Sequence, residues 1–67
     1  MILKINGSER DIPPEVKNIE DLLNFLEIKT RFVAVELNGQ VIYREQYKET
    51  LLKEGDKLEI ASFVGGG

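Results

Sequence analysis

The sequence predicts a two-layer α+β domain in which one helix packs on one face of a five-strand sheet. Asn6-Gly7 and Asn38-Gly39 are the strongest two-residue signals for β-hairpins. Between them lies one stretch with apolar residues at helical spacing, and the runs outside it read as short strands. A helix with one apolar stripe must bury that stripe, and the only surface available is one face of the sheet.

The first hairpin is expected over residues 1–12. Residues 1–5 form an apolar run that ends at Asn6-Gly7, and residues 8–12 return as the second strand. Pro13 and Pro14 end that strand because proline cannot donate a hydrogen bond to a sheet. The two Asn-Gly pairs are interpreted as turn residues with no other role.

The one convincing helix begins after Asn18. The side chain of Asn18 can cap it, and Asp21 follows three residues later in a position that resembles a capping box. The apolar residues of this helix have the spacing i, i+3, i+4, i+7 and are Ile19, Leu22, Leu23 and Leu26.

Three further strands are expected in the second half of the chain, over residues 32–37, 40–43 and 57–63. The segment 44–54 is polar and is expected to hold a short helical turn. Its apolar anchors are Tyr47, Leu51 and Leu52.

One face of the sheet is predicted to be a docking surface. In the last strand Leu58, Ile60 and Ser62 share the side that faces the helix, so Ala61 and Phe63 share the other side. Their own alternation places Ile2 and Ala34 on that same side. Exposed apolar residues gathered on one face suggest a binding site. The alternative is that Phe63 leaves the strand early and packs on the rim of the domain. Arg44 is either a solvated surface charge or a partner contact.

Composition excludes several functions. The 67 residues contain no cysteine and no histidine, so disulfides, thiolate metal sites and Cys-His or Ser-His catalysis are excluded. We expect no catalytic residue and no metal site. The net charge is −3 without a basic block, so no nucleic-acid partner is expected. No apolar run approaches the roughly 20 residues that span a bilayer, and the N-terminus does not resemble a signal peptide. These features predict a cytoplasmic protein without a membrane partner.

The residues resemble a known family over nearly the whole chain. The stretches VAVELNGQVIYREQY (33–47), LLKEGDKLEI (51–60) and FVGGG (63–67) resemble the sulfur-carrier proteins of thiamine (thiazole) biosynthesis. The order of elements also matches the ubiquitin-like β-grasp fold. One departure is Tyr43, where the family often has a proline, and it concerns a surface turn.

This resemblance implies a β-grasp domain over residues 1–63, with a mixed sheet whose first and last strands are parallel neighbours, and a flexible glycine tail over 64–67. It also implies a carrier and not an enzyme. A partner of the ubiquitin-activating type would spend ATP to adenylate the Gly67 carboxylate, while the carrier itself binds no cofactor. A cysteine-desulfurase route would supply sulfur for a thiocarboxylate, and thiazole synthase would accept that sulfur. Val64, Gly65 and Gly66 would enter the partner's site.

Four other interpretations remain open at this point. The glycines could be a frayed end, since disorder collects at termini. The small subunit of molybdopterin synthase has the same fold and terminal chemistry, although EIASFV (59–64) lacks the prolines expected there. A ubiquitin-like protein modifier and a non-covalent interaction module with an idle tail are the remaining two.

Overall fold

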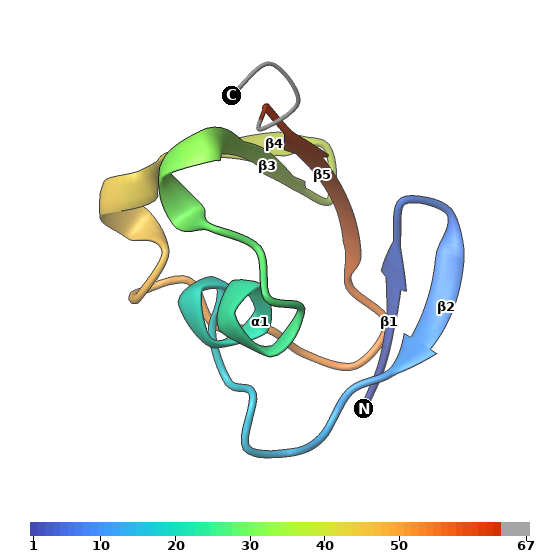
Figure 1. Cartoon of the computed structure of the whole chain (residues 1–67). Coiled ribbons are helices and arrows are strands. Elements are labelled where there is room, and N and C mark those ends of the chain that lie inside the picture. The colour runs from blue at the N-terminus through green and yellow to red at the C-terminus, as the bar shows by residue number, and fades with distance from the viewer. Residues whose placement is uncertain (64–67) are drawn as a thin grey trace.

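The sheet has five strands, and the single α-helix lies against one of its faces (Figure 1). The computed structural model describes residues 1–63. The strands are β1 (Ile2–Ile5), β2 (Ser8–Asp11), β3 (Val33–Leu37), β4 (Gln40–Ile42) and β5 (Lys57–Ser62). The α-helix is α1 (Ile19–Phe25), and two short 3₁₀ turns are η1 (Thr30–Phe32) and η2 (Arg44–Gln46). The predicted α+β architecture and element order are confirmed.

The sheet is mixed, as the resemblance implied. Its strand order is β2-β1-β5-β3-β4. The outer strand β2 pairs antiparallel with β1, and β3 pairs antiparallel with both β4 and β5. The first and last strands are parallel neighbours, with Lys4 opposite Lys57 and Ile5 opposite Leu58. The last strand therefore occupies the centre of the sheet, where both of its neighbours fix its position.

The helix begins and ends at recognisable caps. Asn18 Oδ1 accepts a hydrogen bond from the Asp21 backbone N–H at 2.7 Å, which confirms the predicted N-cap. At the other end the N–H of Ile28 donates to the Leu23 carbonyl, and the N–H of Glu27 donates to the Asn24 carbonyl. These two bonds form a Schellman motif. Its left-handed residue is Glu27, with φ of 61°, at a position where glycine is usual.

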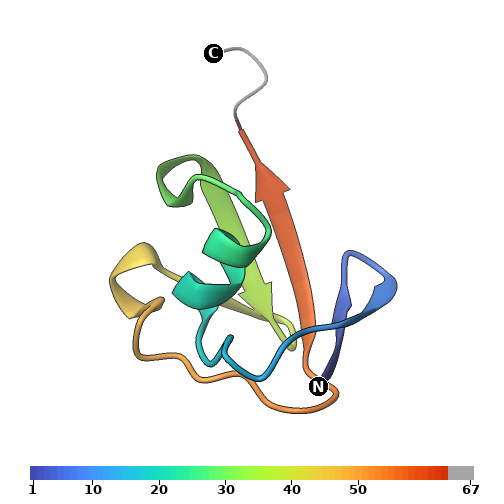
Figure 2. The ribbon, with the colours of Figure 1, turned by 60° about the horizontal axis from the view of Figure 1, so that its bottom comes forward.

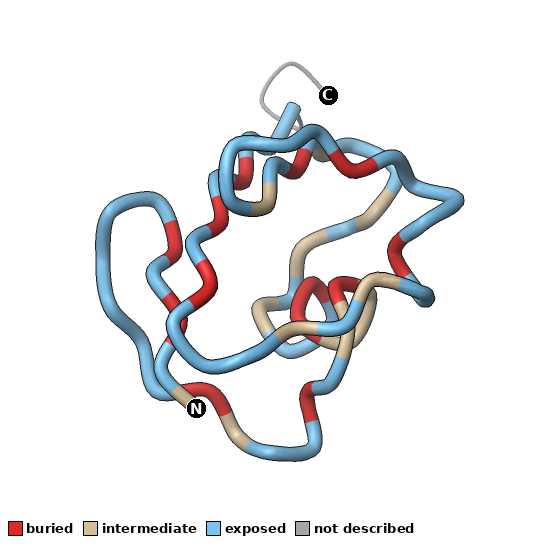
Figure 3. Tube along the Cα trace, turned by 180° about the vertical axis from the view of Figure 1, so that it is seen from behind, coloured by how far each residue is buried: buried red, intermediate tan, exposed pale blue. Residues whose placement is uncertain are grey.

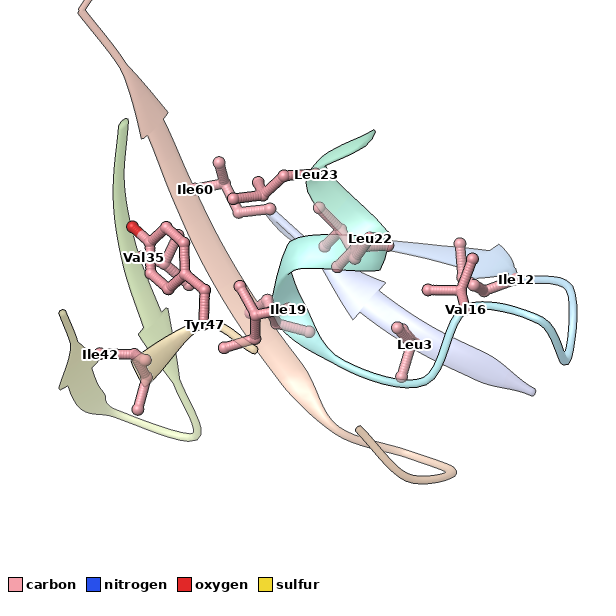
Figure 4. Packing of buried hydrophobic residues seen from close by; sticks show 12 residues of the cluster. Leu3, Ile12, Val16, Ile19, Leu22, Leu23, Val35, Ile42, Tyr47 and Ile60 are labelled. Carbon is pink, nitrogen blue, oxygen red and sulfur yellow. The ribbon is translucent and has the colours of Figure 1, made fainter. Parts of the chain in front are cut away.

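The core lies between α1 and the sheet. Ile19, Leu22 and Leu23 of α1 are fully buried and project toward the strands (Figure 4). The fourth predicted helix residue, Leu26, is partly buried against this cluster. The sheet and loops contribute the other buried apolar residues, which are Leu3, Ile5, Ile12, Val16, Val35, Ile42, Tyr47, Leu58 and Ile60.

Burial alternates along the inner strands, which leaves the second face of the sheet open. In β1 and β5 each residue that faces the helix is followed by an exposed one (Figure 3). A single helix can cover only one face, so the residues between the buried positions meet solvent. The pattern ends at Ser62, which is exposed although its alternation places it on the helix side.

Four local predictions need correction. Leu51 is 69% exposed and does not anchor its loop, whereas Tyr47 is buried there as predicted. The strand expected over 40–43 ends at Ile42, because Tyr43 begins the η2 turn and its backbone N–H donates to Gln46 Oε1. Phe32 belongs to η1, and Phe63 lies just beyond β5.

Candidate functional site

The central strand β5 leads the chain to the end of the sheet from which residues 64–67 continue. Figure 2 shows β5 extending past the β1–β2 hairpin, with the N-terminus at the opposite end of the molecule. The backbone N–H of Phe63 still donates to the Phe32 carbonyl, at 2.6 Å, after the strand has ended. The position from which the tail departs is therefore fixed by main-chain bonds. The predicted flexible tail, with Val64, Gly65, Gly66 and Gly67, lies outside the described residues.

Two of the predicted docking residues lie together on the open face, and a third follows just beyond the strand. Ala34 and Ala61 are cross-strand partners, and both are exposed. Phe63 is 63% exposed, two residues beyond Ala61. Phe63 does leave the strand early, but its side chain does not pack into the domain. The predicted apolar surface is therefore present at the end of the sheet nearest the tail.

A shallow hollow of about 170 Å³ extends this surface across β3 and β4. Its lining includes Ala34, Ala61 and Val41, and Val41 is 51% exposed. The sequence prediction missed Val41, although the alternation that buries its neighbour Ile42 already places Val41 on the open face. We define the docking face by Ala34, Val41, Ala61 and Phe63.

Ile2 does not join the docking face. It lies on the same side of the sheet, as predicted, but the parallel register of β1 and β5 places it at the other end. The Gly55 backbone N–H donates to the Ile2 carbonyl at 2.9 Å, so Ile2 is level with Gly55 and not with Ala61. Gly55 and Ala61 are six residues apart along the turn and β5, which is up to about 20 Å of extended chain. The sequence could assign the face but not the position along it.

Charged side chains surround the docking face. Glu36 and Glu59 stand directly opposite each other on β3 and β5 and contribute to the hollow. Like charges in that position repel, and neither carboxylate belongs to an ion pair within residues 1–63. Two carboxylates therefore meet at this hollow, and Lys57 lies beside Glu59 on the same side of β5.

Arg44 lies apart from these residues, at the start of η2 beyond the edge strand β4. Its side chain is exposed. The positive charge of Arg44 affects the pKa of the buried Tyr47 side chain. Burial raises the pKa of the Tyr47 phenol above its ordinary value, and the nearby Arg44 charge partly opposes that shift by lowering the pKa. Arg44 thus has a local electrostatic effect in the free protein, and a contact with a partner remains a prediction.

The two Asn-Gly turns do more than reverse the chain, contrary to the sequence interpretation. Asn6 Oδ1 accepts the Ile60 backbone N–H at 2.7 Å, and Asn6 Nδ2 donates to the Ile60 carbonyl at 3.0 Å. Asn38 likewise bonds the turn before β5 through its side chain. Both asparagines have positive φ, which is common for this residue in turns. The dipeptide signal predicts the turn, but the side-chain partners are distant in sequence and cannot be deduced from it.

No group of three or more potential metal-ligating side chains occurs among residues 1–63. None of the helices described there is long and apolar enough to cross a bilayer. What the described residues offer is a folded domain with an exposed apolar docking face near the end of β5.

Comparisons with known proteins point to one family. The model described as the ThiS family matches residues 3–67. The sulfur carrier protein ThiS of Bacillus subtilis is 36% identical over 66 residues, which are 98% of this chain and all of that protein. The crystal structure of a thiamine biosynthesis protein (ThiS) from Geobacter metallireducens superimposes with a TM-score of 0.83 at 38% identity, covering all of both chains.

The comparisons also include a longer kind of protein. A thiazole synthase of Paramagnetospirillum magneticum is 42% identical over 67 residues. This chain is covered completely by that match but spans only 20% of the length of the thiazole synthase. The thiazole synthase of Magnetococcus marinus gives the same coverage at 41% identity. A segment similar to this whole chain therefore forms part of two proteins of that name.

Proposed function

We propose, from the premise that this chain belongs to the ThiS family and is a sulfur carrier of thiamine biosynthesis, that the carboxylate of Gly67 carries the sulfur. The observation that carries the proposal is the placement of β5. This strand brings the chain to the end of the sheet beside an exposed apolar face, and VGGG follows immediately. A partner that binds the docking face would receive those last residues.

The chemistry begins with activation, because a carboxylate is ionised at neutral pH and acylates poorly. A carboxylate oxygen of Gly67 attacks the α-phosphorus of ATP in the partner's site, and pyrophosphate leaves. The outer sulfur of a donor persulfide then attacks the carbonyl carbon, and AMP leaves. A thiol cleaves the resulting acyl disulfide, so the thiocarboxylate is released while the thiol and the donor sulfur are oxidised to a disulfide. The product is a thiocarboxylate in which one oxygen has been exchanged for sulfur.

Glycine suits such a terminus for two reasons. It has no side chain to obstruct a narrow entry, and its backbone adopts angles that other residues avoid. Five residues from Phe63 to Gly67 can span about 17 Å when extended. That length allows the carboxylate to reach a pocket that excludes water, which the reactive anhydride requires.

Three partners belong to this proposal. An adenylyltransferase of the ubiquitin-activating type consumes the ATP, a cysteine-desulfurase route provides the sulfur, and thiazole synthase receives it. The last partner is supported by the two thiazole synthases that include a segment similar to this chain. The acidic pair Glu36 and Glu59 beside the docking face favours a basic side chain on the partner that binds there.

The chain itself acts as substrate and carrier. It has no histidine or cysteine and no glycine-rich loop between a strand and a helix that could bind phosphates. The purified carrier should therefore show no ATP–pyrophosphate exchange until the adenylyltransferase is added. The molybdopterin synthase subunit and the protein modifier are not favoured, since the similar proteins are named for thiamine and thiazole.

The test adds one alanine after Gly67. The added residue moves the terminal carboxylate by about 3.5 Å, and a misplacement of roughly 1 Å can cost about a hundredfold in rate. We expect adenylation and thiocarboxylate formation to fall by at least that factor. Intact-mass spectrometry measures the product as a gain equal to the difference between sulfur and oxygen. The extended protein should melt at the temperature of the native one, since every described core residue lies before Phe63. Equal thiocarboxylation of the two proteins would contradict the proposal.

A further inference from the structure

We propose that β5 has a free backbone edge at Ser62, and that an extended segment of the adenylylating partner pairs with it as an added strand. This inference rests on the proposed function, because it concerns how the body is held while Gly67 reacts. It follows from the hydrogen-bond pattern of β5, whose backbone groups alternate between two neighbours.

The odd-numbered residues of β5 bond to β3. The Asn38 N–H donates to the Lys57 carbonyl, and the Phe63 N–H donates to the Phe32 carbonyl. Both bonds fit the antiparallel register that joins Ala34 with Ala61. Because backbone groups alternate in direction along a strand, residues 57, 59, 61 and 63 are directed toward β3.

The even-numbered residues are directed toward β1. The Lys4 N–H donates to the Asp56 carbonyl at 2.9 Å, and the Asn6 N–H donates to the Leu58 carbonyl at the same distance. At the next level the main chain of β1 has already turned into the hairpin. The Asn6 side-chain amide takes its place and bonds both the N–H and the carbonyl of Ile60. A primary amide has the donor and the acceptor of a peptide group, so Asn6 acts as the last residue of the pairing strand.

Ser62 is the next even-numbered residue, and no described residue remains to pair with it on this side. The β1–β5 register ends before it, and the alternation along β5 directs its backbone groups away from β3, where Ser62 and Val33 form a pair without hydrogen bonds. In Figure 2 β5 continues beyond the β1–β2 hairpin, which curves away from it. The N–H and carbonyl of Ser62 therefore form an open position in the middle of the sheet, and not at its outer edge.

The surroundings of this open position differ from those of an outer strand. The β2 residues whose backbone is directed outward are Glu9 and Asp11, since Ile12 and the other even-numbered residues bond to β1. Charged side chains on an edge discourage pairing with other chains. Ser62 instead stands between Ala61 and Phe63, which are exposed and apolar. The outer edge formed by β2 is protected in this way, and the free position at Ser62 is not.

The occupant that fits is an extended segment of the partner that receives the tail. Ser62 is five residues from Gly67, a reach of about 17 Å, so any partner that holds the carboxylate must also pass close to this edge. Strand addition to a free edge is a known mode of recognition in which main-chain bonds provide the affinity. It would also fix how far the tail reaches, because the register of a strand pair is discrete.

Amide hydrogen exchange tests this directly on the native protein. In the free carrier we expect the Ser62 amide to exchange rapidly and the Phe63 amide slowly, since only the latter is bonded. In the complex with the cognate adenylyltransferase and ATP, the Ser62 amide should become protected by at least about tenfold. A Ser62 amide that stays unprotected in the complex would overturn the proposal. So would protection in the free carrier that increases with its concentration, which would indicate pairing between two copies.

A proline substitution provides the functional test. Ser62→Pro removes an N–H that no described residue uses, so the variant should fold, whereas Ser62→Ala keeps the N–H and tests the side chain alone. One hydrogen bond typically changes an equilibrium by about 2- to 10-fold. We expect Ser62→Pro to raise the adenylyltransferase KM for the carrier by that factor, with kcat little changed, and Ser62→Ala to have no effect.

The matched control is Glu9→Pro, which removes an outward N–H from the outer strand β2. It should leave KM unchanged. Equal KM values for Ser62→Pro and Glu9→Pro would overturn the strand-addition proposal, while continued adenylation of both would leave the role of Gly67 intact. If Ser62→Pro does not fold, the exchange measurement on the native protein decides the question.

Discussion

Asn38 and Asp56 join the β3–β4 turn to the turn that precedes β5. Asn38 Nδ2 donates to Asp56 Oδ1 at 3.1 Å, and Asp56 Oδ2 accepts the Lys53 backbone N–H at 2.9 Å. The side-chain oxygen of Asn38, Oδ1, accepts a hydrogen bond from the Lys57 backbone N–H at 3.0 Å. Asp56 is only 3% exposed. This network fixes where the central strand begins, and hence which residue stands at the far end beside the tail.

Asp56→Ala should therefore destabilise the domain. It leaves a backbone N–H and a side-chain amide without their acceptor in a mostly buried position, which costs about 1–3 kcal/mol of unfolding free energy. Urea denaturation measures the loss. The control is Asp11→Ala, whose carboxylate is exposed and lies 3.7 Å from the Met1 amino group, and it should change stability by less than about 0.5 kcal/mol. Equal effects of the two substitutions would contradict this role for Asp56.

A second prediction concerns packing under the helix. Leu22 is fully buried between α1 and the sheet, so Leu22→Ala removes apolar contacts and leaves a cavity. The expected cost is about 2–5 kcal/mol, which is a large share of the stability of so small a domain. Leu51→Ala is the matched control, because Leu51 is exposed and should lose little. Thermal melting of both variants makes the comparison, and a Leu22→Ala protein as stable as Leu51→Ala would disprove the packing role.

The sequence predicted those parts of the fold that depend on local patterns. The hairpins follow from the Asn-Gly pairs, and α1 follows from Asn18 and the apolar spacing of Ile19, Leu22 and Leu23. The helix end could not be predicted, because Glu27 adopts the left-handed conformation without the glycine that normally signals it. Leu51 was misplaced because an apolar residue in a loop gives no periodicity from which its burial could be judged.

The candidate site was predicted in part for the same reason. Alternation along each strand put Ala34 and Ala61 on the open face, where they form a cross-strand pair, whereas Phe63 lies beyond the end of β5. The position of each residue along the sheet depends on register between strands that are distant in sequence, which alternation does not contain. That is why Ile2 was grouped with Phe63, and why the Asn6 side chain was not connected with Ile60. The free edge at Ser62 follows from the bonds between Asn6 and Ile60, because they are the last bonds on the β1 side of β5 before Ser62.

The buried phenol of Tyr47 gives a prediction in pH. Burial raises the pKa of Tyr47 above its ordinary value of 10.0, and Arg44 lowers it in part. Above pH 10 the unfolded chain loses this proton before the folded chain does, so stability decreases as pH rises from there toward the folded pKa. Below about pH 9 this group contributes no pH dependence.

Chemical denaturation of the native protein and Tyr47→Phe across this range tests the prediction. The stability of the native protein relative to Tyr47→Phe should be constant below about pH 9 and should fall above pH 10. Arg44→Gln removes the opposing influence and should steepen that fall. Parallel stability curves for the native protein and Tyr47→Phe would contradict a raised pKa at this position.

The last prediction concerns the docking face. It compares Phe63 with Ile2, which the sequence assigned to one surface and which the structure places at opposite ends of the sheet. Phe63→Asp should weaken recognition by the adenylyltransferase, because a charge would replace an apolar side chain that becomes buried on binding. Burial of such a side chain is worth about 1.5–3 kcal/mol, so KM for the carrier should rise at least about tenfold while kcat changes little. The variant should still fold, since Phe63 is exposed and only its backbone bonds to the sheet.

Two matched controls should leave KM unchanged. They are Phe25→Asp, on an exposed position of α1, and Ile2→Asp, at the far end of the open face. An increase in KM for Ile2→Asp equal to that for Phe63→Asp would mean that the partner covers the whole open face, and an unchanged KM for Phe63→Asp would exclude the docking face as the site of recognition.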